Sequence, residues 1–172
     1  MKLFLFLLCL TVSSAALCQY DIEVAGELYQ KHLQAQESGE IYESYLILSN
    51  IIERDFKLPE YNNAVLHSSL GIASKNLGLY EKARINYEIA LSHCNRETEN
   101  ELTLYLDILT NLGILHRHLG EYSMAIEYYE EVERLLQNSH SNDRQNLNRF
   151  SLVKLNKAIV YFDIREYSDA VA

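Results

Sequence analysis

Cysteine, proline, glycine and tryptophan are all scarce in this sequence. Its 172 residues include three cysteines, one proline, six glycines and no tryptophan. Cys9 and Cys18 lie near the N-terminus, so Cys94 stands nearly alone in the rest of the chain and no disulfide framework holds the fold. We expect Cys94 to be a small, partly buried hydrophobic residue. His93 beside it does not complete a metal site, because zinc needs about four ligands and no others cluster there.

Motifs that carry catalysis are missing as well. The sequence has no glycine-rich phosphate loop, no Gly-x-Ser-x-Gly elbow and no His-Glu-x-x-His. His116 and His118 would lie about 200° apart on a helix, so they cannot chelate one ion; we expect one to be half-buried and the other solvated. Glu130 and Glu131 are expected on a solvent-facing surface. The sequence therefore predicts neither an enzyme nor a bound metal or cofactor.

Basic residues are outnumbered by acidic ones. The chain has 15 lysines and arginines against 24 aspartates and glutamates, which gives a formal net charge of -9. Phosphate backbones repel such a protein, and this argues against a nucleic-acid partner. Anionic lipid surfaces repel it for the same reason. The simplest role of the charge is to keep the protein soluble.

The N-terminus has the pattern of a secretory signal peptide. Lys2 precedes a short apolar run, and small residues up to Ala16 follow it. The run is too short to cross a bilayer, which takes about 20 residues, and nothing later is apolar enough. We predict that residues 1–18 form a signal peptide that is cleaved after Ala16 or after Cys18, and that the protein is exported, either secreted or periplasmic. Acylation of Cys18, as in a bacterial lipoprotein, is less favoured because Leu17 stands where a small residue is preferred.

Residues 19–172 show helical periodicity, with apolar residues recurring at intervals of three and four. A corner pattern recurs among them: a glycine, an aromatic residue two positions later and an alanine three positions after that. It begins at Gly78 and Gly120, and weaker copies begin at Gly39 and Arg165. Each copy predicts that one helix ends, that glycine takes the left-handed conformation and that a new helix starts at once.

Small and aromatic residues keep a fixed distance from these corners. Gly71, Gly113 and Ala158 each stand twelve positions before the corner alanine, and Tyr87 and Tyr129 stand four positions after it. With a leucine before each glycine, the sequence resembles the tetratricopeptide repeat, whose pattern is Leu-Gly, then Tyr, then Ala-x3-Phe. The glycines of successive repeats are 42 residues apart, against about 34 in the usual repeat. This long form resembles the repeats of kinesin light chain and of bacterial scaffold proteins.

The resemblance implies an all-α fold, an α-α superhelix of antiparallel helix pairs with about three and a half repeats. The expected repeats are 22–55, 60–95, 98–139 and 142–172, the last of them incomplete. The expected helices are 22–37, 41–55, 60–77, 80–94, 98–119, 122–138, 142–164 and 167 onward. Thr98 and Glu101 are spaced as a capping box that opens one of these helices.

The resemblance also implies a concave groove, lined by the first helix of each pair, where a peptide or protein partner binds. The groove positions carried over from the family are Ser69, Ile72, Lys75, Asn76, Asn111, Ile114, Arg117, His118, Asn156 and Phe162. Ser69, Asn111 and Asn156 form a ladder of short polar groups suited to a peptide backbone; the alternative is an ordinary solvated face. The carboxylate clamp of chaperone-binding members is not expected, because Ser68 and Ile72 replace the lysine and asparagine that it needs.

The last helix pair ends early at Ala172, without the residues that would complete its second helix. We therefore expect Leu155, Ile159 and Val160 to be exposed at an open end, which a continuation of the chain, a partner or a second copy would cover. The sequence favours an exported interaction module or scaffold. The alternative is the N-terminal sensory or regulatory region of a longer signalling or protease-containing protein truncated at residue 172.

Overall fold

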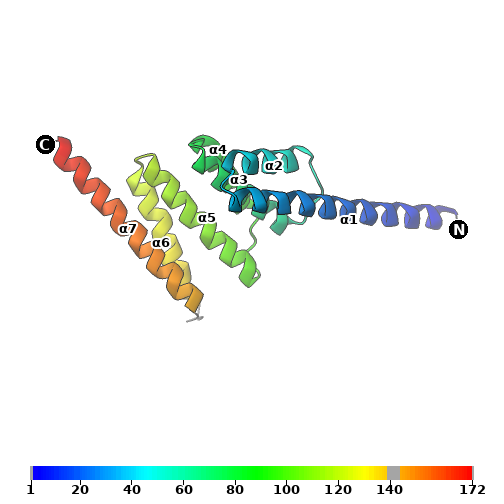
Figure 1. The fold of residues 1–172 in the computed structure, drawn as a ribbon. Helices are drawn as coiled ribbons and strands as arrows, with labels where there is room; N and C mark the ends of the chain where they lie inside the picture. The colour runs from blue at the N-terminus through cyan, green and yellow to red at the C-terminus, as the bar shows by residue number, and fades with distance from the viewer. Residues whose placement is uncertain (1, 139–143, 172) are drawn as a thin grey trace.

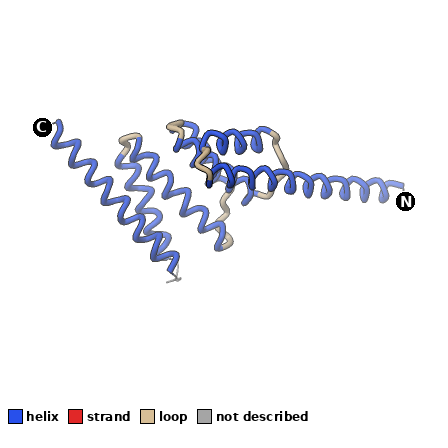
Figure 2. Tube along the Cα trace, in the orientation of Figure 1, coloured by secondary structure: helices blue, strands red, loops and turns tan. Residues whose placement is uncertain are grey.

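The computed structural model describes the backbone of residues 2–138 and 144–171, and the side chains of 19–137 and 144–165. Over these residues the chain forms helices and no strands, which confirms the predicted all-α class (Figure 2). The helices are α1 (Lys2–Glu37), α2 (Ile41–Glu53), α3 (Glu60–Asn76), α4 (Tyr80–Ser92), α5 (Glu99–His118), α6 (Tyr122–Asn138) and α7 (Arg144–Val171).

Successive helices pack as antiparallel neighbours in an elongated array, with the two termini at opposite ends (Figure 1). The pairs are α1 with α2, α3 with α4, and α5 with α6, and α7 packs against α6. The first helices of successive pairs also touch, α3 against α5 and α5 against α7. This is the arrangement of an α-α superhelix, in which the first helices line one side of the array.

Glycine closes the first helix of each of the three pairs. Gly39, Gly78 and Gly120 have φ of 76°, 74° and 76°, as the corner pattern predicts. At the second corner the amide of Leu79 donates to the carbonyl of Ser74 at 2.9 Å, and at the third the amide of Glu121 donates to the carbonyl of His116 at 2.8 Å. These six-to-one bonds satisfy carbonyls that the helix end would otherwise leave unpaired.

The fourth predicted corner is absent. α7 continues without a break to Val171, so the predicted division into helices 142–164 and 167 onward is wrong. Arg165 stands where the other corners have glycine, and the left-handed conformation costs a residue with a Cβ about 1–2 kcal/mol. The helix therefore continues through that position. α1 also differs from its predicted start near 22, because its helical backbone begins at Lys2.

The remaining helix ends lie within about two residues of their predicted positions. The capping box is confirmed at the start of α5, where the Thr98 hydroxyl accepts from the Glu101 amide at 3.2 Å and the Glu101 carboxylate accepts from the Thr98 amide at 3.1 Å. Two non-glycine residues with positive φ, Asp55 and Arg96, lie in the segments that connect one helix pair to the next.

The core runs along the array as three clusters instead of one. The first joins α1, α2 and α3 around Leu48 and Ile51, the second joins α3, α4 and α5 around Tyr87, and the third joins α5, α6 and α7 around Tyr129. Each helix pair therefore buries its apolar face against its neighbours, as in a repeat solenoid.

Two burial predictions are corrected by the structure. Val160 is fully buried in the third cluster, because it lies seven residues from Val153 on the α7 face that packs against α6. Leu155 is 58% exposed and Ile159 half-buried, nearer to expectation. His116 is not half-buried but fully buried, with Nδ1 at 2.5 Å from the Glu121 carboxylate across the corner.

In the first helix pair, different residues form the close contact between the first and the second helix. His32 stands twelve positions before Ser44, the place that glycine takes in the next two pairs, and Leu48 stands where they have tyrosine. His32 Nδ1 and Ser44 Oγ share a buried hydrogen bond of 2.8 Å. A larger residue on the first helix is thus matched by smaller ones on the second.

Candidate functional site

The side of the array formed by the first helices carries three adjoining hollows. The first, of about 250 Å³, lies between α1 and α3 and is lined by residues that include Ile22, Gly26 and Leu66. The second, of about 330 Å³, lies among α1, α3 and α5, and the third, of about 290 Å³, among α3, α5 and α7. Every helical residue that lines them belongs to α1, α3, α5 or α7. We call the three hollows together the trough.

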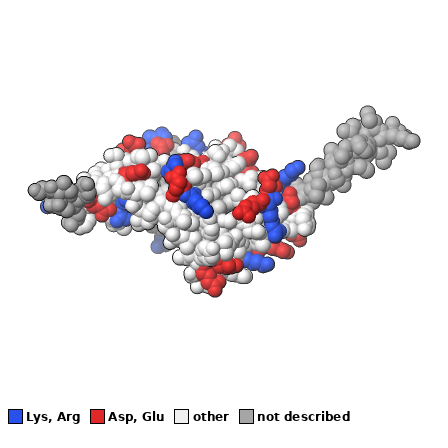
Figure 3. All heavy atoms as spheres, turned by 90° about the horizontal axis from the view of Figure 1, so that it is seen from above, with Lys and Arg blue, Asp and Glu red and all other residues white. Residues whose placement is uncertain are grey.

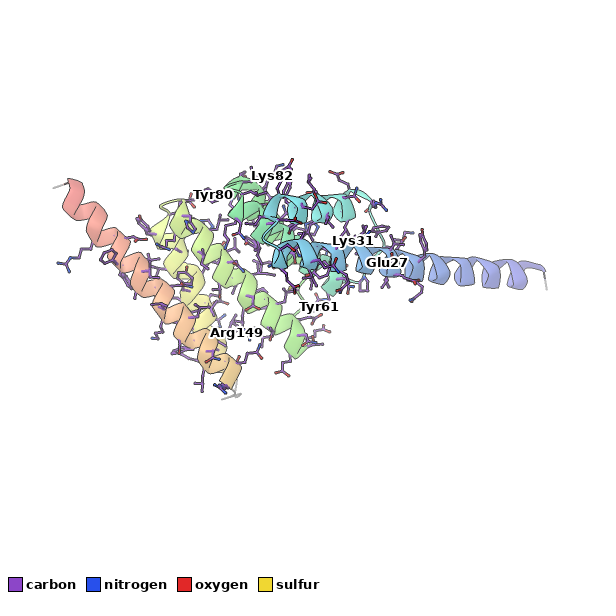
Figure 4. The ribbon with its side chains drawn as sticks, in the orientation of Figure 1. Glu27, Lys31, Tyr61, Tyr80, Lys82 and Arg149 are labelled. Carbon is purple, nitrogen blue, oxygen red and sulfur yellow. The ribbon has the colours of Figure 1, made fainter. Side chains whose placement is uncertain are left out.

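Shared walls make the trough continuous. Tyr29, Tyr61 and Val65 line both the first and the second hollow. Ile72, Asp107 and Asn111 line both the second and the third. Figure 4 labels Tyr61 on α3, which lines the first and second hollows, and Arg149 on α7, which lines the third. An elongated ligand could therefore contact all four first helices.

The structure brings only some of the predicted groove residues into the trough. Those that line it are Ser69, Ile72, Asn111 and Ile114. Asn76 instead lines a smaller hollow beside His32, which shares Ser69 and Ile72 with the trough. His118 is exposed and stacks on Tyr80 with ring centroids 6.1 Å apart. Phe162 is 61% exposed on α7.

Several predicted groove residues form hydrogen bonds between neighbouring first helices. They are Ser69, Lys75, Asn111 and Arg117. Tyr29 OH and Ser69 Oγ share a hydrogen bond of 3.0 Å between α1 and α3. Lys75 Nζ donates to Asn111 Oδ1 at 3.4 Å between α3 and α5. Between α5 and α7, Arg117 Nε donates to Asp163 Oδ2 at 2.6 Å. We call these three contacts the struts.

Two residues of the polar ladder that was predicted to bind a peptide backbone take part in the struts. Ser69 and Asn111 are both strut residues, and the Asn111 amide also donates to the carbonyl of Asp107 at 3.0 Å. The third member, Asn156, lies half-buried on α7, and its buried Nδ2 has no hydrogen-bond partner among the described residues. The ladder stays a prediction as a binding element, but two of its three members already serve the fold.

Charges in the trough are neutralised within it. Arg149 donates through Nε and Nη2 to the two carboxylate oxygens of Asp107 at 3.1 and 3.2 Å, in a two-bond contact between α7 and α5. Lys75 lines none of the three hollows, and burial lowers the pKa of its ammonium. On the face that Figure 3 shows, several basic groups likewise lie next to acidic ones.

Sequence reasoning missed part of the trough. Tyr29, Tyr61, Leu104 and the Asp107–Arg149 pair were not among the predicted groove residues. Helical spacing could have found Asp107, which lies seven residues before Ile114 and so on the same face. The tyrosines carry no such signal, because their place depends on how α1 packs against α3.

Within the part of the chain whose residues are described, no group of three or more His, Cys, Asp or Glu side chains could hold a metal ion. In the same residues, no helix is long and apolar enough to cross a membrane. Cys94 is buried, and burial raises the pKa of its thiol, which keeps the thiol protonated and unreactive.

Comparison with known proteins agrees with this geometry. Residues 62–138 match the family model of the tetratricopeptide repeat. A solved structure of a TPR-like protein from Chlorobium tepidum superposes with a TM-score of 0.66 at 15% identity, over 83% of this chain and 98% of that one. No curated protein matches the chain. The matched segment therefore carries the tetratricopeptide repeat, and the superposition shows that the chain has the fold of a TPR-like protein.

Proposed function

We propose that this protein is an exported interaction module that binds a peptide or protein segment along the trough. The observation that carries the proposal is the continuity of the three hollows across four helices. Concave, mostly apolar surfaces with a few convergent polar groups are where proteins bind ligands. Export is supported by Lys2, the short apolar run after it and the small residues up to Ala16.

Site-specific photo-crosslinking tests binding along the trough. A photoreactive amino acid is placed at Leu152, which lines the third hollow, in the cell that produces the protein. The matched control places it at Leu147, which is 57% exposed on the same helix but lines none of the three hollows. We expect a defined crosslinked partner from Leu152 and not from Leu147. Equal crosslinking from both positions would contradict the proposal.

N-terminal sequencing tests export separately. We expect the protein recovered outside the cytoplasm to begin at Leu17 or Gln19, because those residues follow the two predicted cleavage points. A product that is recovered there and still begins with Met1 would show that no signal peptide is removed.

A further inference from the structure

The second hollow is lined by polar side chains that have no partner within the described part of the protein. Four of them come from α3 and α5, and none forms a side-chain hydrogen bond with another described residue; they are Tyr61, Ser68, Asn100 and Thr103. Ser68 is only 5% exposed, and what it lines is this hollow. A buried hydroxyl without a hydrogen bond is unfavourable, so a bound molecule that supplies the bond would explain its place.

The described lining of the second hollow offers no free charge. Asp107 is the charged residue in it, and both carboxylate oxygens already accept from Arg149, at 3.1 and 3.2 Å. A charged group of a ligand would therefore lose its water there without gaining a free partner of opposite sign, which is unfavourable. Each carboxylate oxygen keeps a further lone pair, so Asp107 can still accept from a hydroxyl. The hollow therefore suits an uncharged ligand with hydroxyl donors.

Hydroxyls are the commonest free groups in the second hollow. Tyr61, Ser68 and Thr103 each carry one, which can both donate and accept, and Asn100 adds an amide that can also do both. A ligand hydroxyl has the same double capacity, so a ligand with several hydroxyls can satisfy these groups whichever way each of them turns. A peptide backbone instead offers one N–H and one carbonyl per residue. The free groups therefore match a ligand with many hydroxyls better than a peptide.

Apolar surface lies beside these polar groups. Tyr29, whose hydroxyl shares a hydrogen bond of 3.0 Å with Ser69 Oγ, lines the hollow together with Val65 and Leu104. A tyrosine ring presents apolar faces, and a pyranose ring carries C–H groups on its faces and hydroxyls around its rim. The hollow measures about 330 Å³, at the lower end of the roughly 300–1,000 Å³ usual for ligand sites. Its size and lining therefore fit a small saccharide.

We propose that the second hollow binds a small neutral saccharide. Ser68 on α3 and Thr103 on α5 form hydrogen bonds with its hydroxyls, and Asp107 accepts from another. The rings of Tyr29 and Tyr61 pack against its C–H groups. This goes beyond the proposed function, because it needs the second hollow alone and not a ligand that runs along all four first helices.

Saturation-transfer difference NMR with the protein tests the proposal. The neutral probes are glucose, N-acetylglucosamine, maltose and N,N′-diacetylchitobiose. Each is titrated to about 10 mM, because small uncharged ligands held by a few hydrogen bonds bind in the micromolar to millimolar range. We expect at least one of these probes to bind. Glucuronic acid, the charged counterpart of glucose, should not bind, since its carboxylate finds no free cation in the described lining.

Ser68→Ala and Ser74→Ala form a matched pair of variants on α3. Both hydroxyls belong to buried residues and lack a hydrogen-bond partner among the described residues, but Ser74 lines none of the hollows. Neither variant should lower the midpoint of urea unfolding, because neither removes a hydrogen bond. Ser68→Ala should weaken saccharide binding about fivefold, the loss of one hydrogen bond, and Ser74→Ala should leave it unchanged. Thr103→Val keeps the shape of its side chain and should weaken binding by a similar factor.

The inference is overturned if none of the neutral probes binds, or if glucuronic acid binds as tightly as the best of them. It is also overturned if the wild type, Ser68→Ala and Thr103→Val bind the preferred probe with equal affinity, because the site then lies elsewhere. A loss of affinity in Ser74→Ala as large as that in Ser68→Ala would attribute the effect to the helix and not to the hollow, and so contradict the assignment. None of these results bears on crosslinking from Leu152, which tests the proposed function in the third hollow.

Discussion

The ring of Tyr87 lies against the backbone of Gly71 so closely that a Cβ atom built on the glycine would stand 2.6 Å from ring carbon Cδ1. Tyr129 lies over Gly113 in the same way one repeat later. Both rings are completely buried, so they cannot turn aside. The repeat therefore uses glycine in the middle of a helix, where it costs about 1 kcal/mol relative to alanine, because the tyrosine ring occupies the space of its side chain.

Gly71→Ala should therefore destabilise the protein although alanine favours a helix. We expect a loss of about 1–3 kcal/mol, the usual cost of overpacking a core, measured as a lower midpoint of urea unfolding. Gly26→Ala is the matched control, because Gly26 is also in a helix but has nothing within 4 Å of the added Cβ. The control should be neutral or stabilising by up to about 1 kcal/mol. Equal effects of the two substitutions would show that the ring does not set the requirement for glycine.

Gly120→Val tests the corner conformation separately from packing. Gly120 has φ of 76° and nothing within 4 Å of an added Cβ, so the Cβ itself meets no clash and we expect the loss to come from the backbone conformation. We expect a loss of about 1–2 kcal/mol for valine and a smaller one for Gly120→Asn, since asparagine tolerates the left-handed region. Urea unfolding of both variants gives the comparison. A valine variant as stable as the wild type would contradict the corner.

How well the fold could be predicted depended on local signals. The corners at Gly78 and Gly120 were predictable because the glycine that makes the turn is itself in the pattern. At Arg165 the neighbouring aromatic and alanine matched the pattern, yet the helix continues because the residue that permits the turn is missing. Helix ends follow from such short-range rules, and a match at the flanking positions does not replace the residue that makes the turn.

The candidate site was less predictable, because its contacts join residues far apart in sequence. Ile72 and Ile114 could be placed in the trough by their fixed distance from the repeat glycines. The strut between Arg117 and Asp163 spans 46 positions and depends on how α7 packs on α5. No periodicity within one helix indicates which polar side chains will bind the next helix and which will face a ligand.

The buried His32, which is hydrogen-bonded to Ser44 in the first repeat, should make the stability of the protein depend on pH. Burial lowers the pKa of His32 below its ordinary value of 6.5, so the folded protein resists a proton that the unfolded chain accepts. The stability that this neutral histidine contributes is fully present above about pH 6.5 and is lost as the pH falls below that value. Replacing it with glutamine should therefore reduce the fall in the urea midpoint between about pH 7.5 and pH 5.5.

Ser44→Ala is the companion to that measurement. It removes the hydroxyl that bonds His32 Nδ1 and leaves a buried polar nitrogen unpaired, which costs about 1–3 kcal/mol. We expect this loss already at about pH 7.5, where the ring is neutral, so it differs from the histidine effect in its pH dependence. A His32→Gln variant whose midpoint falls with pH as steeply as that of the wild type would show that other groups carry the dependence.

The backbone amides of α7 should be less protected against hydrogen exchange than those of α5. α5 is covered on two sides and buries residues along its length, among them Leu106, Leu112 and Leu115. On α7 the fully buried side chains are Val153 and Val160 among those described, while Leu155 and Phe162 are 58% and 61% exposed. Stability in a solenoid is close to a sum of local terms, so a helix packed on one side opens more readily. Amide hydrogen exchange should therefore be faster across 150–165 than across 105–118 in the monomer.

We predict that the same exposed residues, Leu155 and Phe162, pair α7 with a second copy at high protein concentration. If they do, protection of α7 should rise with protein concentration together with the mass measured by sedimentation, because association removes its apolar face from water. Leu155→Glu should abolish the rise, while Ile85→Glu, at an exposed position on α4, should not. Protection of α7 equal to that of α5 at concentrations where the protein is monomeric would contradict the prediction. It would mean that the contacts of α7 with α5 and α6 alone hold this helix as firmly as packing on two sides holds α5.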